Sequence, residues 1–420
     1  MEIRKITITG LFGHLNHTLD LSDPINIIMG DNGVGKTVTL RLVKAIHESD
    51  FHYILQTEFD TIEVLFKSRK NGRIIYTKRD NTVNVKSSSK INSTFDVRPS
   101  DICSNVPSFY KEVAQGRWLD TQTKEILTED ELEIRLDKHL YVLNHGVLKE
   151  WYERIFKDTS IHMIRTQRLY HFSELSSTGN ILTIQTYANE LKQYLNSELA
   201  EAGKNAAKKD SSFPIRLVKH LKAHRTYTMS ELNDDFNRVK GTQELLSAVG
   251  FIDVETFDLD ELTKSRDDDK HVLMNVFKLY ISDNIEKLSL YKKAADKVSL
   301  FKDIINQHLR SKYIEVNPEY GFRIKSNVAI SKDDDISIDK LSSGEQNEII
   351  LFYELIFKCD NCNMVLVDEP EISLHLEWLQ TMLNDFQEIF KQTGTKMLIA
   401  THSPDFVGDN YSLVQNLTYE

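Results

Sequence analysis

The sequence predicts an α/β fold built from two separated stretches of chain, with a helical arm inserted between them. The first observation is a set of short apolar runs typical of buried parallel strands, at 25–29, 364–367 and 397–400. The second is that segments with helical spacing adjoin these runs, as strand–helix–strand units require. The third is the stretch from Phe251 to Asn317, which contains neither glycine nor proline and has apolar residues at steps of three and four.

These patterns give the expected boundaries of the parts. Residues 1–180 and 314–420 are expected to form the two halves of one head, and residues 181–313 the arm. Within the arm, the apolar stripe from Leu273 to Leu309 predicts a helix of about 55 Å at ~1.5 Å per residue. The stripe needs a partner helix, and either of two segments can supply it, 182–209 or 229–249.

Composition narrows the classes of protein. The chain has 420 residues, 40% of them hydrophobic, and a formal charge of −11 at pH 7. Because its surface cannot be basic all over, any contact with nucleic acid must come from local patches of Lys and Arg. No apolar run reaches the ~18–20 residues that cross a bilayer, and the polar start MEIRKITITG is unlike a signal peptide. We therefore expect a cytoplasmic protein without a membrane segment.

A glycine-rich loop follows the first apolar run. Residues 30–37 read GDNGVGKT, which fits the phosphate-loop pattern G-x-x-x-x-G-K-[ST], and a helical segment follows. Glycines let backbone N–H groups point at phosphates, and the helix N-terminus adds partial positive charge. A chance glycine turn would not explain this context. Lys36 is expected to neutralise the β- and γ-phosphates and Thr37 to bind Mg²⁺. The residues expected to contact nucleotide are Gly30, Asn32, Gly33, Gly35, Lys36, Thr37 and Val38.

Two acids end the apolar run at 364–367. Asp368 stands at the predicted strand tip, where its carboxylate can hold Mg²⁺. Glu369 follows directly and can polarise an attacking water as general base. Two solvated acids at a strand end are common when such a pattern stands alone. With a phosphate loop in the same chain, we expect Asp368 to be a metal ligand and Glu369 to be catalytic.

Residues 341–346 read LSSGEQ and end 22 residues before Asp368 (368 − 346). Together with GDNGVGKT and VLVDEPE, this segment resembles the signature of ABC ATPases, and more narrowly the heads of SMC/RecF-type ABC ATPases. The resemblance implies a P-loop NTPase head of the ABC type, made of two sequence halves. It also implies a homodimer joined head to tail around ATP, in which Ser342, Gly344 and Glu345 meet the γ-phosphate held by the opposite head. A serine N-cap explains Ser342 alone but not the order of the motifs.

Three further positions match the family pattern. His402, after the run at 397–400, matches the switch histidine that senses the γ-phosphate and is expected to be catalytic. Gln167 matches the glutamine that ligates Mg²⁺, although Arg165 or Arg168 could matter instead. His375 is a departure, because many ABC proteins have Asp there. That departure puts in doubt how the two heads are coupled, but not hydrolysis.

Two stretches are rich in positive charge and are candidates for DNA or RNA contact. Residues 61–90 carry eight Lys and Arg against two acids, and residues 201–225 carry seven against two. Either could follow a phosphate backbone. Solvated faces of a hairpin and a helix explain them equally well.

Three functions fit an ABC-type head to different degrees. The 131 residues between Lys36 and Gln167 (167 − 36) and the missing membrane segment argue against a transporter domain. A DNA-repair or chromosome-maintenance ATPase agrees with the motifs but usually has a longer arm. The compact size and the DEPE…LH form at 368–375 resemble standalone ATPases of bacterial anti-phage systems of the Septu or PARIS type. That resemblance implies a homodimer or higher oligomer that controls a separately encoded nuclease.

Overall fold

The computed structural model shows two compact units, one formed by Met1–Thr183 with Leu341–Glu420 and the other by Ile184–Lys340. We call the first the head unit and the second the arm unit. The arm was expected to end at residue 313, whereas the arm unit continues to Lys340. The structure describes residues 2–67, 72–88, 93–114, 117–122, 124, 126–128, 132, 136, 140–156, 159–172, 180–223, 226–252, 267–327, 335–359 and 362–419.

A five-stranded parallel sheet forms the centre of the head unit, and both halves of the sequence contribute to it. In spatial order its strands are β13 (Ile161–Ile164), β19 (Met364–Asp368), β20 (Lys396–Thr401), β3 (Ile25–Met29) and β21 (Val414–Asn416). β19 is buried along its whole length, which is why its sequence is a continuous apolar run. The predicted fold class, an α/β head made of two sequence halves with a helical insertion, is confirmed.

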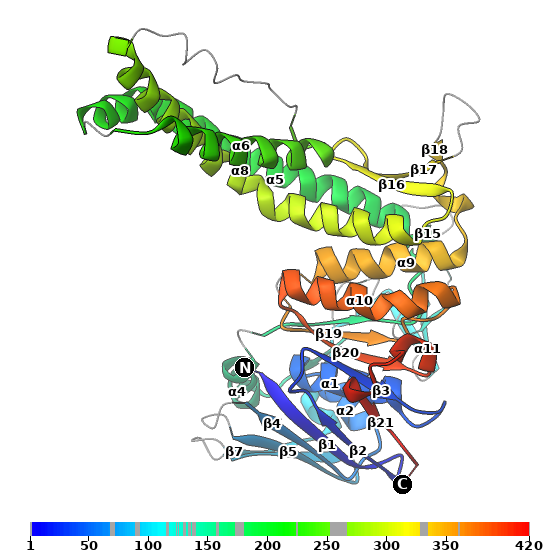
Figure 1. Ribbon diagram of the computed structural model, residues 1–420. Helices are drawn as coiled ribbons and strands as arrows, with labels where there is room; N and C mark the ends of the chain where they lie inside the picture. The colour runs from blue at the N-terminus through cyan, green and yellow to red at the C-terminus, as the bar shows by residue number, and fades with distance from the viewer. Residues whose placement is uncertain are drawn as a thin grey trace. The chain divides into compact units, whose positions relative to one another are not determined.

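Helices cover both faces of this sheet (Figure 1). α1 (Lys36–Glu48) packs on one face through its apolar side, in one core with Leu366 and Leu398 of the strands. α9 (Ser343–Tyr353) and α10 (Leu376–Thr393) lie on the other face. Among the described residues of the head unit, the other α-helices are α2 (Phe51–Gln56), α4 (Gly146–Phe156) and α11 (Pro404–Val407).

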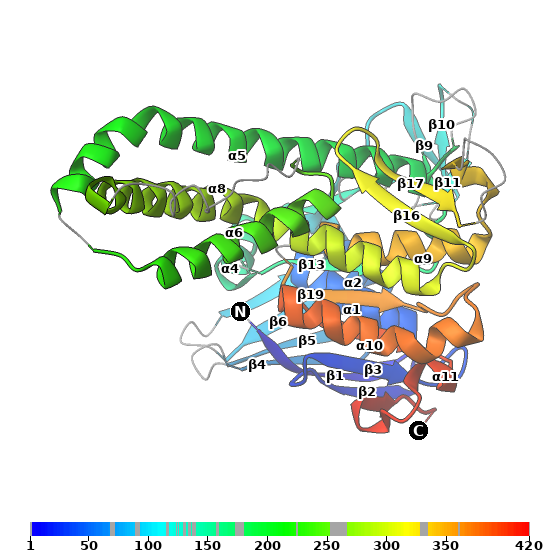
Figure 2. The ribbon, with the colours of Figure 1, turned by 45° about the horizontal axis from the view of Figure 1, so that its top comes forward.

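A six-stranded antiparallel sheet lies beside the parallel one in the head unit (Figure 2). Its buried and exposed residues alternate, as expected for a sheet with one face in the core. The basic stretch 61–90 forms three successive strands of this sheet, at 61–66, 73–79 and 82–87, each paired antiparallel with the next. In spatial order the strands are β2 (Leu15–Asp20), β1 (Ile3–Leu11), β4 (Thr61–Phe66), β5 (Arg73–Arg79), β6 (Thr82–Ser87) and β7 (Ser93–Val97).

The described residues between 102 and 182 also contain seven short strands of the head unit. They pair antiparallel in three small groups. The groups are β8 (Ile102–Ser104) with β12 (Tyr141–Leu143); β9 (Tyr110–Ala114) with β10 (Arg117–Asp120) and β11 (Ile126–Thr128); and β14 (Tyr170–Phe172) with β15 (Asn180–Leu182).

The register of the parallel sheet aligns three strand ends. Asp368 at the end of β19 is opposite Ala400 of β20, and Thr401 at the end of β20 is opposite Met29 of β3. The segments that follow β3, β19 and β20 therefore begin at one edge of the sheet. The carboxyl edge of a parallel sheet is where ligands bind in open α/β folds.

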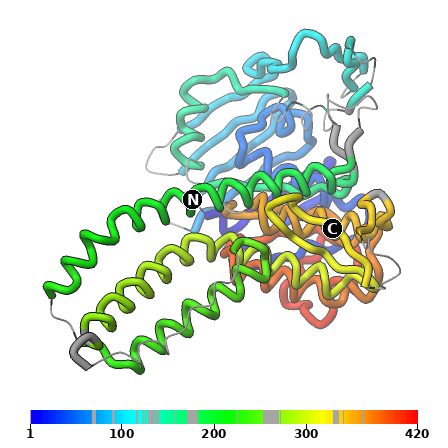
Figure 3. Tube along the Cα trace, turned by 90° about the horizontal axis from the view of Figure 1, so that it is seen from above, coloured from blue at the N-terminus to red at the C-terminus, as the bar shows by residue number. Residues whose placement is uncertain are grey.

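The arm unit contains three long helices that extend together (Figure 3). α8 (Asp267–His308) carries the predicted apolar stripe, and both candidate partners run beside it, α5 (Thr183–Lys222) and α6 (Met229–Ala248). Lys209 of α5 pairs with Glu286 of α8, and Asp235 of α6 pairs with Lys278 of α8. The predicted long helix is confirmed, and both alternatives for its partner are realised.

A three-stranded sheet completes the arm unit and explains its extent. A Cβ on Gly321, whose φ is +80°, would lie 1.8 Å from the carbonyl oxygen of Ala188 in α5. Only glycine permits this approach, which seats the turn between two strands on the helix. The strands are β16 (Lys312–Asn317), β17 (Gly321–Ser326) and β18 (Asp335–Ile336). Among the residues that the structure describes in either unit, no helix is long and apolar enough to cross a bilayer.

Candidate functional site

The phosphate loop joins β3 to α1, and its glycines are required by its shape. Gly33 and Gly35 have φ values of +89° and +85°, in the left-handed region that side chains disfavour. A Cβ on Gly30 would lie 2.7 Å from the carbonyl oxygen of Leu417. Gly35 is the N-cap of α1, so the loop leads directly into a helix N-terminus. This is the geometry that presents backbone N–H groups to an anion.

Lys36 turns back onto the loop that precedes it. Its Nζ donates hydrogen bonds to the carbonyl oxygens of Gly30 (2.7 Å) and Asp31 (3.0 Å), and the residue is 6% exposed. The ammonium group is thus held beside the loop, where it can meet a phosphate. Two residues outside the motif also hold the loop. His17 Nε2 lies 2.8 Å from the carbonyl oxygen of Val34, and the Tyr419 hydroxyl donates to the carbonyl oxygen of Asn32 (2.8 Å).

Thr37 and Asp368 meet although 331 residues separate them. The Thr37 hydroxyl donates to the Asp368 carboxylate at 3.1 Å from both of its oxygens. The Thr166 hydroxyl, after β13, donates to Oδ2 of the same carboxylate at 3.0 Å. Burial raises the pKa of Asp368, as does the neighbouring charge of Glu369, while the two threonine hydroxyls act in the opposite direction. A bound cation would relieve the cost of this buried charge.

Glu369 and His402 lie together at the next position along the sheet edge. Glu369 has a φ of +46°, a left-handed backbone conformation that is strained for a residue with a Cβ. Its N–H donates to the carbonyl oxygen of Ala400. His402 Nδ1 lies 3.5 Å from Glu369 Oε1 and 3.2 Å from Glu371 Oε1. The two residues predicted to be catalytic are therefore in one cluster, together with a third residue that had no predicted role.

Arg168 supports this cluster from inside the protein. It is 5% exposed, and its Nη2 donates to the carbonyl oxygen of Pro370 at 3.1 Å. Burial lowers the pKa of Arg168 to about 10, against the effect of nearby Glu354, Glu371 and Asp368. The guanidinium therefore stays charged at pH 7 and holds the turn that carries Glu369.

Gln167 is placed differently from its neighbours. Its side chain is exposed, and none of the hydrogen bonds among the described residues joins it to Asp368 or Thr37. Thr166 and Arg168 contact the segment around Asp368 instead. The metal-binding role of Gln167 remains a prediction. His375 is the exposed N-cap of α10, with its ring 5.6 Å from that of Trp378.

The signature segment begins α9. The Ser342 hydroxyl accepts from the Glu345 N–H (3.2 Å), and Glu345 Oε2 accepts from the Ser342 N–H (2.9 Å), which together form a capping box. Ser342 is exposed. Gly344 is buried against the loop before α10, where an added Cβ would lie 2.5 Å from the carbonyl oxygen of Ser373. Within the described residues, no hydrogen bond joins this segment to Lys36 of its own chain.

The residues present fit a triphosphate with a hard divalent cation. The loop offers a helix N-terminus and an ammonium group, and Thr37 and Asp368 offer the oxygen ligands that Mg²⁺ prefers. Among the described residues there is no cluster of three or more His, Cys, Asp or Glu side chains arranged to hold a metal by themselves. A cation here would thus share its coordination with phosphate oxygens and water, as Mg²⁺ commonly does. The last two predicted contacts lie in the same loop and helix: Asn32 is exposed and Val38 is half-buried.

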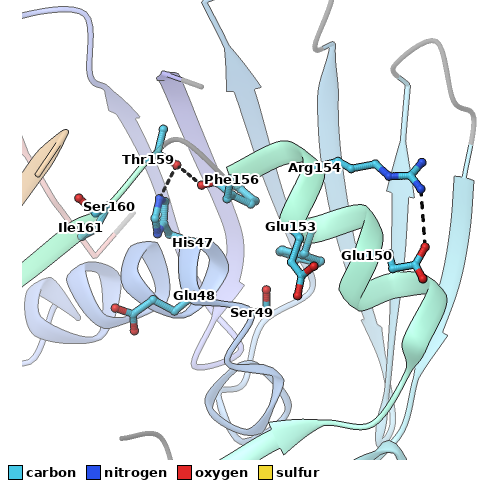
Figure 4. Close-up of a pocket in the computed structure, with 11 residues that line it drawn as sticks. His47, Glu48, Ser49, Glu150, Glu153, Arg154, Phe156, Thr159, Ser160 and Ile161 are labelled. Carbon is cyan, nitrogen blue, oxygen red and sulfur yellow. Dashed lines mark hydrogen bonds and ion pairs between the residues drawn. The ribbon is translucent and has the colours of Figure 1, made fainter. Parts of the chain in front are cut away.

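A separate cavity of about 820 Å³ lies at the C-terminal end of α1 (Figure 4). It is lined by His47 of α1 and by residues of α4, among them Glu150 and Arg154, which pair at 3.6 Å. His47 Nε2 lies 2.7 Å from the Thr159 hydroxyl, and burial lowers the pKa of the ring to about 4. None of the residues predicted to bind nucleotide is among the described residues of this lining.

Comparison with known proteins identifies the family. Residues 1–407 match the family model described as an AAA ATPase domain. The chain belongs to this family. It is also similar to a crystal structure of the SmcHead bound to the C-winged helix domain of ScpA, with a TM-score of 0.40 and 12% identity, over 99% of this chain and 94% of that one. No curated protein sequence matches the chain.

A second solved structure is the Smc head domain with an extended coiled coil bound to the C-terminal domain of ScpA, from Pyrococcus furiosus. It has a TM-score of 0.37 and 13% identity, over 100% of this chain and 94% of that chain. Membership of an ATPase domain family agrees with the predicted nucleotide-binding head. The narrower assignment to standalone anti-phage ATPases stays a prediction.

Proposed function

We propose that this protein binds and hydrolyses ATP with Mg²⁺, as an ABC-type head that works in head-to-tail pairs. One observation carries the proposal. Thr37 and Asp368, from opposite halves of the sequence, share a hydrogen bond at 3.1 Å, and Glu369 and His402 lie at the same sheet edge. A phosphate loop, a metal-binding acid and a residue that orients the attacking water are the parts that P-loop NTPases use for phosphoryl transfer to water. His402 matches the histidine that ABC-type heads add to this set.

Each residue has a distinct part in this proposal. Lys36 and the N–H groups of the loop bind the β- and γ-phosphates, and Thr37, Asp368 and Gln167 hold the cation. Bound Mg²⁺ would offset the negative charge on the phosphate oxygens. Glu369 orients a water for attack on the γ-phosphate and accepts its proton.

The signature surface supports a paired arrangement. Ser342 is exposed at the start of α9, where the helix N-terminus carries partial positive charge. Gly344 packs against Ser373, so the signature and the loop before α10 move together. We infer that Ser342, Gly344 and Glu345 meet the γ-phosphate of a second copy, which completes two sites in the pair.

A substitution at Glu369 tests both parts of the proposal. Glu369→Gln should lower turnover by at least about 100-fold, the usual contribution of a general base, while ATP stays bound. Because ATP then persists, the mass measured by light scattering with ATP should rise to that of a dimer. Glu388→Gln, on the exposed side of α10, is the matched control and should leave turnover unchanged. Normal turnover in Glu369→Gln, or full activity of the wild-type monomer at high dilution, would refute the proposal.

The biological role we favour is control of a separate nuclease in a bacterial anti-phage complex. It is supported by the DEPE…LH form at 368–375 and by the compact size of the chain, both of which rest on resemblance. The alternative is an ATPase of DNA repair or chromosome maintenance. Purification from the native host distinguishes them: a nuclease encoded next to this gene should co-purify in the first case. A repair or replication gene cluster without such a nuclease would favour the second.

The ion pairs of the arm limit which basic residues of 201–225 can contact nucleic acid. Lys209 and Arg216 form ion pairs with Glu286 and Asp283 of α8, so their charge is already engaged. Other lysines of this stretch are exposed and lie on one side of α5 at helical spacing, namely Lys204, Lys208, Lys219 and Lys222. These four, rather than the paired residues, are the ones we propose to contact a phosphate backbone.

The measurement is the salt dependence of binding to DNA and RNA oligonucleotides. Charge reversal at Lys208 or Lys219 should reduce the slope of log affinity against log salt by about 1 for each phosphate that the lysine no longer neutralises. Lys292→Glu, at an exposed position of α8, is the control. Slopes that are equal in all variants would show that this face of α5 is only solvated.

A further inference from the structure

A buried carboxylate with no predicted role lies at the centre of the candidate site. Glu371 is 7% exposed, and its polar neighbours gather at one of its oxygens, Oε1. Oε1 accepts from the Thr401 hydroxyl at 2.5 Å and from the His402 N–H at 2.9 Å, and it lies 3.2 Å from His402 Nδ1. The other oxygen, Oε2, is buried and has no hydrogen-bond partner among the residues that the structure describes. Burying a carboxylate with half its acceptors unused costs stability, and an apolar residue would fill the space at lower cost.

The turn that carries Glu371 is fixed at several points. Its first residue, Glu369, has a φ of +46° and donates its N–H to the carbonyl oxygen of Ala400. The carbonyl oxygen of Pro370 accepts from buried Arg168, and the Ile372 N–H donates back to the carbonyl oxygen of Glu369. The strain at Glu369 is therefore held by contacts on both sides of the turn. The backbone that carries both carboxylates is therefore held in place.

The imidazole of His402 lies against both carboxylates. Nδ1 is 3.2 Å from Glu371 Oε1 and 3.5 Å from Glu369 Oε1. A ring nitrogen this close to two carboxylate oxygens is the one we expect to carry hydrogen, which would set the tautomer and the orientation of the ring. With Nδ1 engaged, Nε2 is the ring nitrogen left to meet a phosphate.

We propose that Glu371 is a positioning residue that ties the switch histidine to the catalytic turn. It holds the backbone and the ring of His402 through one oxygen, so that Nδ1 faces Glu369 and Nε2 remains available to the γ-phosphate. Glu371 itself touches neither substrate nor cation. This inference rests on the proposed function, because it assigns His402 and Glu369 to the hydrolysis of ATP.

The decisive experiment is a double-mutant cycle of Glu371→Gln and His402→Ala in the full chain. Glu371→Gln alone should lower kcat at least tenfold and change the KM for ATP less than threefold, because the nucleotide contacts of Lys36 and Thr37 are intact. In the His402→Ala background, Glu371→Gln should change kcat less than twofold, since the residue acts through the histidine. Independent, multiplicative losses in the double variant would overturn the inference.

A second readout needs no turnover. Nitrogen-15 spectra of histidine-labelled protein without nucleotide should show His402 with hydrogen on Nδ1, assigned by loss of that signal in His402→Ala. In Glu371→Gln the amide can offer N–H groups to Nδ1, so the Nδ1–H form should lose its dominance. An unchanged His402 tautomer would count against Glu371, because Glu369 alone would then suffice to set it.

Controls separate this inference from general effects and from the proposed function. Asp385→Asn neutralises another buried carboxylate, at 8% exposure on α10, and should leave kcat unchanged; an equal loss there would overturn the inference. If Glu371→Gln does not fold, Thr401→Val removes one hydrogen bond to the same carboxylate and should lower kcat about threefold. An unchanged kcat in Thr401→Val would overturn the inference. Wild-type protein that does not hydrolyse ATP would refute the proposed function, while the histidine spectra would still test the role of Glu371.

Discussion

Gly344 in the signature segment provides a sharp test of how α9 contacts the loop before α10. A Cβ at this position would lie 2.5 Å from the carbonyl oxygen of Ser373 and 3.7 Å from Cζ3 of Trp378. The second distance is ordinary van der Waals contact, whereas the first is one that real Cβ atoms essentially never show. Ser373 has a φ of +63°, so the loop has little freedom to withdraw. Gly344→Ala therefore forces a backbone shift of at least 0.5 Å (3.0 − 2.5).

The matched control is Gly146→Ala at the start of α4 in the same unit. A Cβ there meets nothing within 4 Å, so this variant shows the ordinary gain of ~0.5–1 kcal/mol when glycine in a helix becomes alanine. Both substitutions add the same group in the first turn of a helix. Their difference isolates the overpacking cost, which is about 1–3 kcal/mol for a methyl forced into a packed contact.

Urea denaturation followed by tryptophan fluorescence measures this difference, since Trp378 is buried beside the contact. Gly344→Ala should unfold at lower urea than Gly146→Ala, and it should also lower ATP turnover, because the signature and the loop move together. Equal urea midpoints for the two alanine variants would refute the reasoning. That result would mean that α9 and the loop before α10 are not in the close contact that the structure shows.

Three further predictions concern Asp368, the neighbouring Thr166 and the Arg216–Asp283 ion pair of the arm. Because burial raises the pKa of Asp368, its ionised form destabilises the fold above the unfolded pKa of about 4, and this cost is absent below that pKa. Asp368→Asn should therefore raise metal-free stability at pH 7, and by less near pH 4.5, while it abolishes turnover; urea titrations at both pH values check this. Thr166→Val removes a hydrogen bond to that carboxylate and should weaken Mg²⁺ activation about tenfold; unchanged Mg²⁺ activation in Thr166→Val would show that Thr166 does not position Asp368. In the arm, Arg216→Leu leaves Asp283, 4% exposed, without its partner and should cost about 3–5 kcal/mol in urea titrations, whereas adding Asp283→Leu should recover most of it.

The phosphate loop and the acids at 368–369 were accessible from the sequence because local rules govern them. Gly33 and Gly35 sit at positive φ, where only glycine is free of strain, so the motif itself encodes the turn. The strand at 364–367 is buried on all sides, so its apolar run predicts a parallel sheet. The long helix of the arm follows in the same way from the spacing of its apolar residues.

Other features had no local signal. In the segment after β13, the family pattern predicts a role for Gln167. The residues that contact the turn around Asp368 are instead its neighbours, Thr166 and Arg168. Glu371 was visible as part of DEPE, but its contacts to Thr401 and His402 depend on a neighbouring strand. A pairing that spans 30 residues or more leaves no periodicity in the chain for sequence reasoning to find.

The charges of the arm are a second case in which contacts distant in sequence could not be predicted. The lysines and arginines of 201–225 form one basic stretch in the sequence, but the structure divides it. Lys209 and Arg216 face the acids of α8, while Lys204 and Lys208 remain exposed. A charge count cannot separate these groups, because the partners lie 67 to 77 residues further along the chain.

The sequence by itself determined the elements whose causes are short-range: the phosphate loop, the buried strands, the helical insertion and the acids at a strand tip. Only the tertiary structure decided which of them meet. Parallel pairing of β3, β19 and β20 brings Thr37, Asp368 and His402 to one edge, and it buries Glu371 there. The physical reason is that backbone propensities act over a few residues, whereas a binding site is made by long-range contacts that no short stretch of sequence specifies.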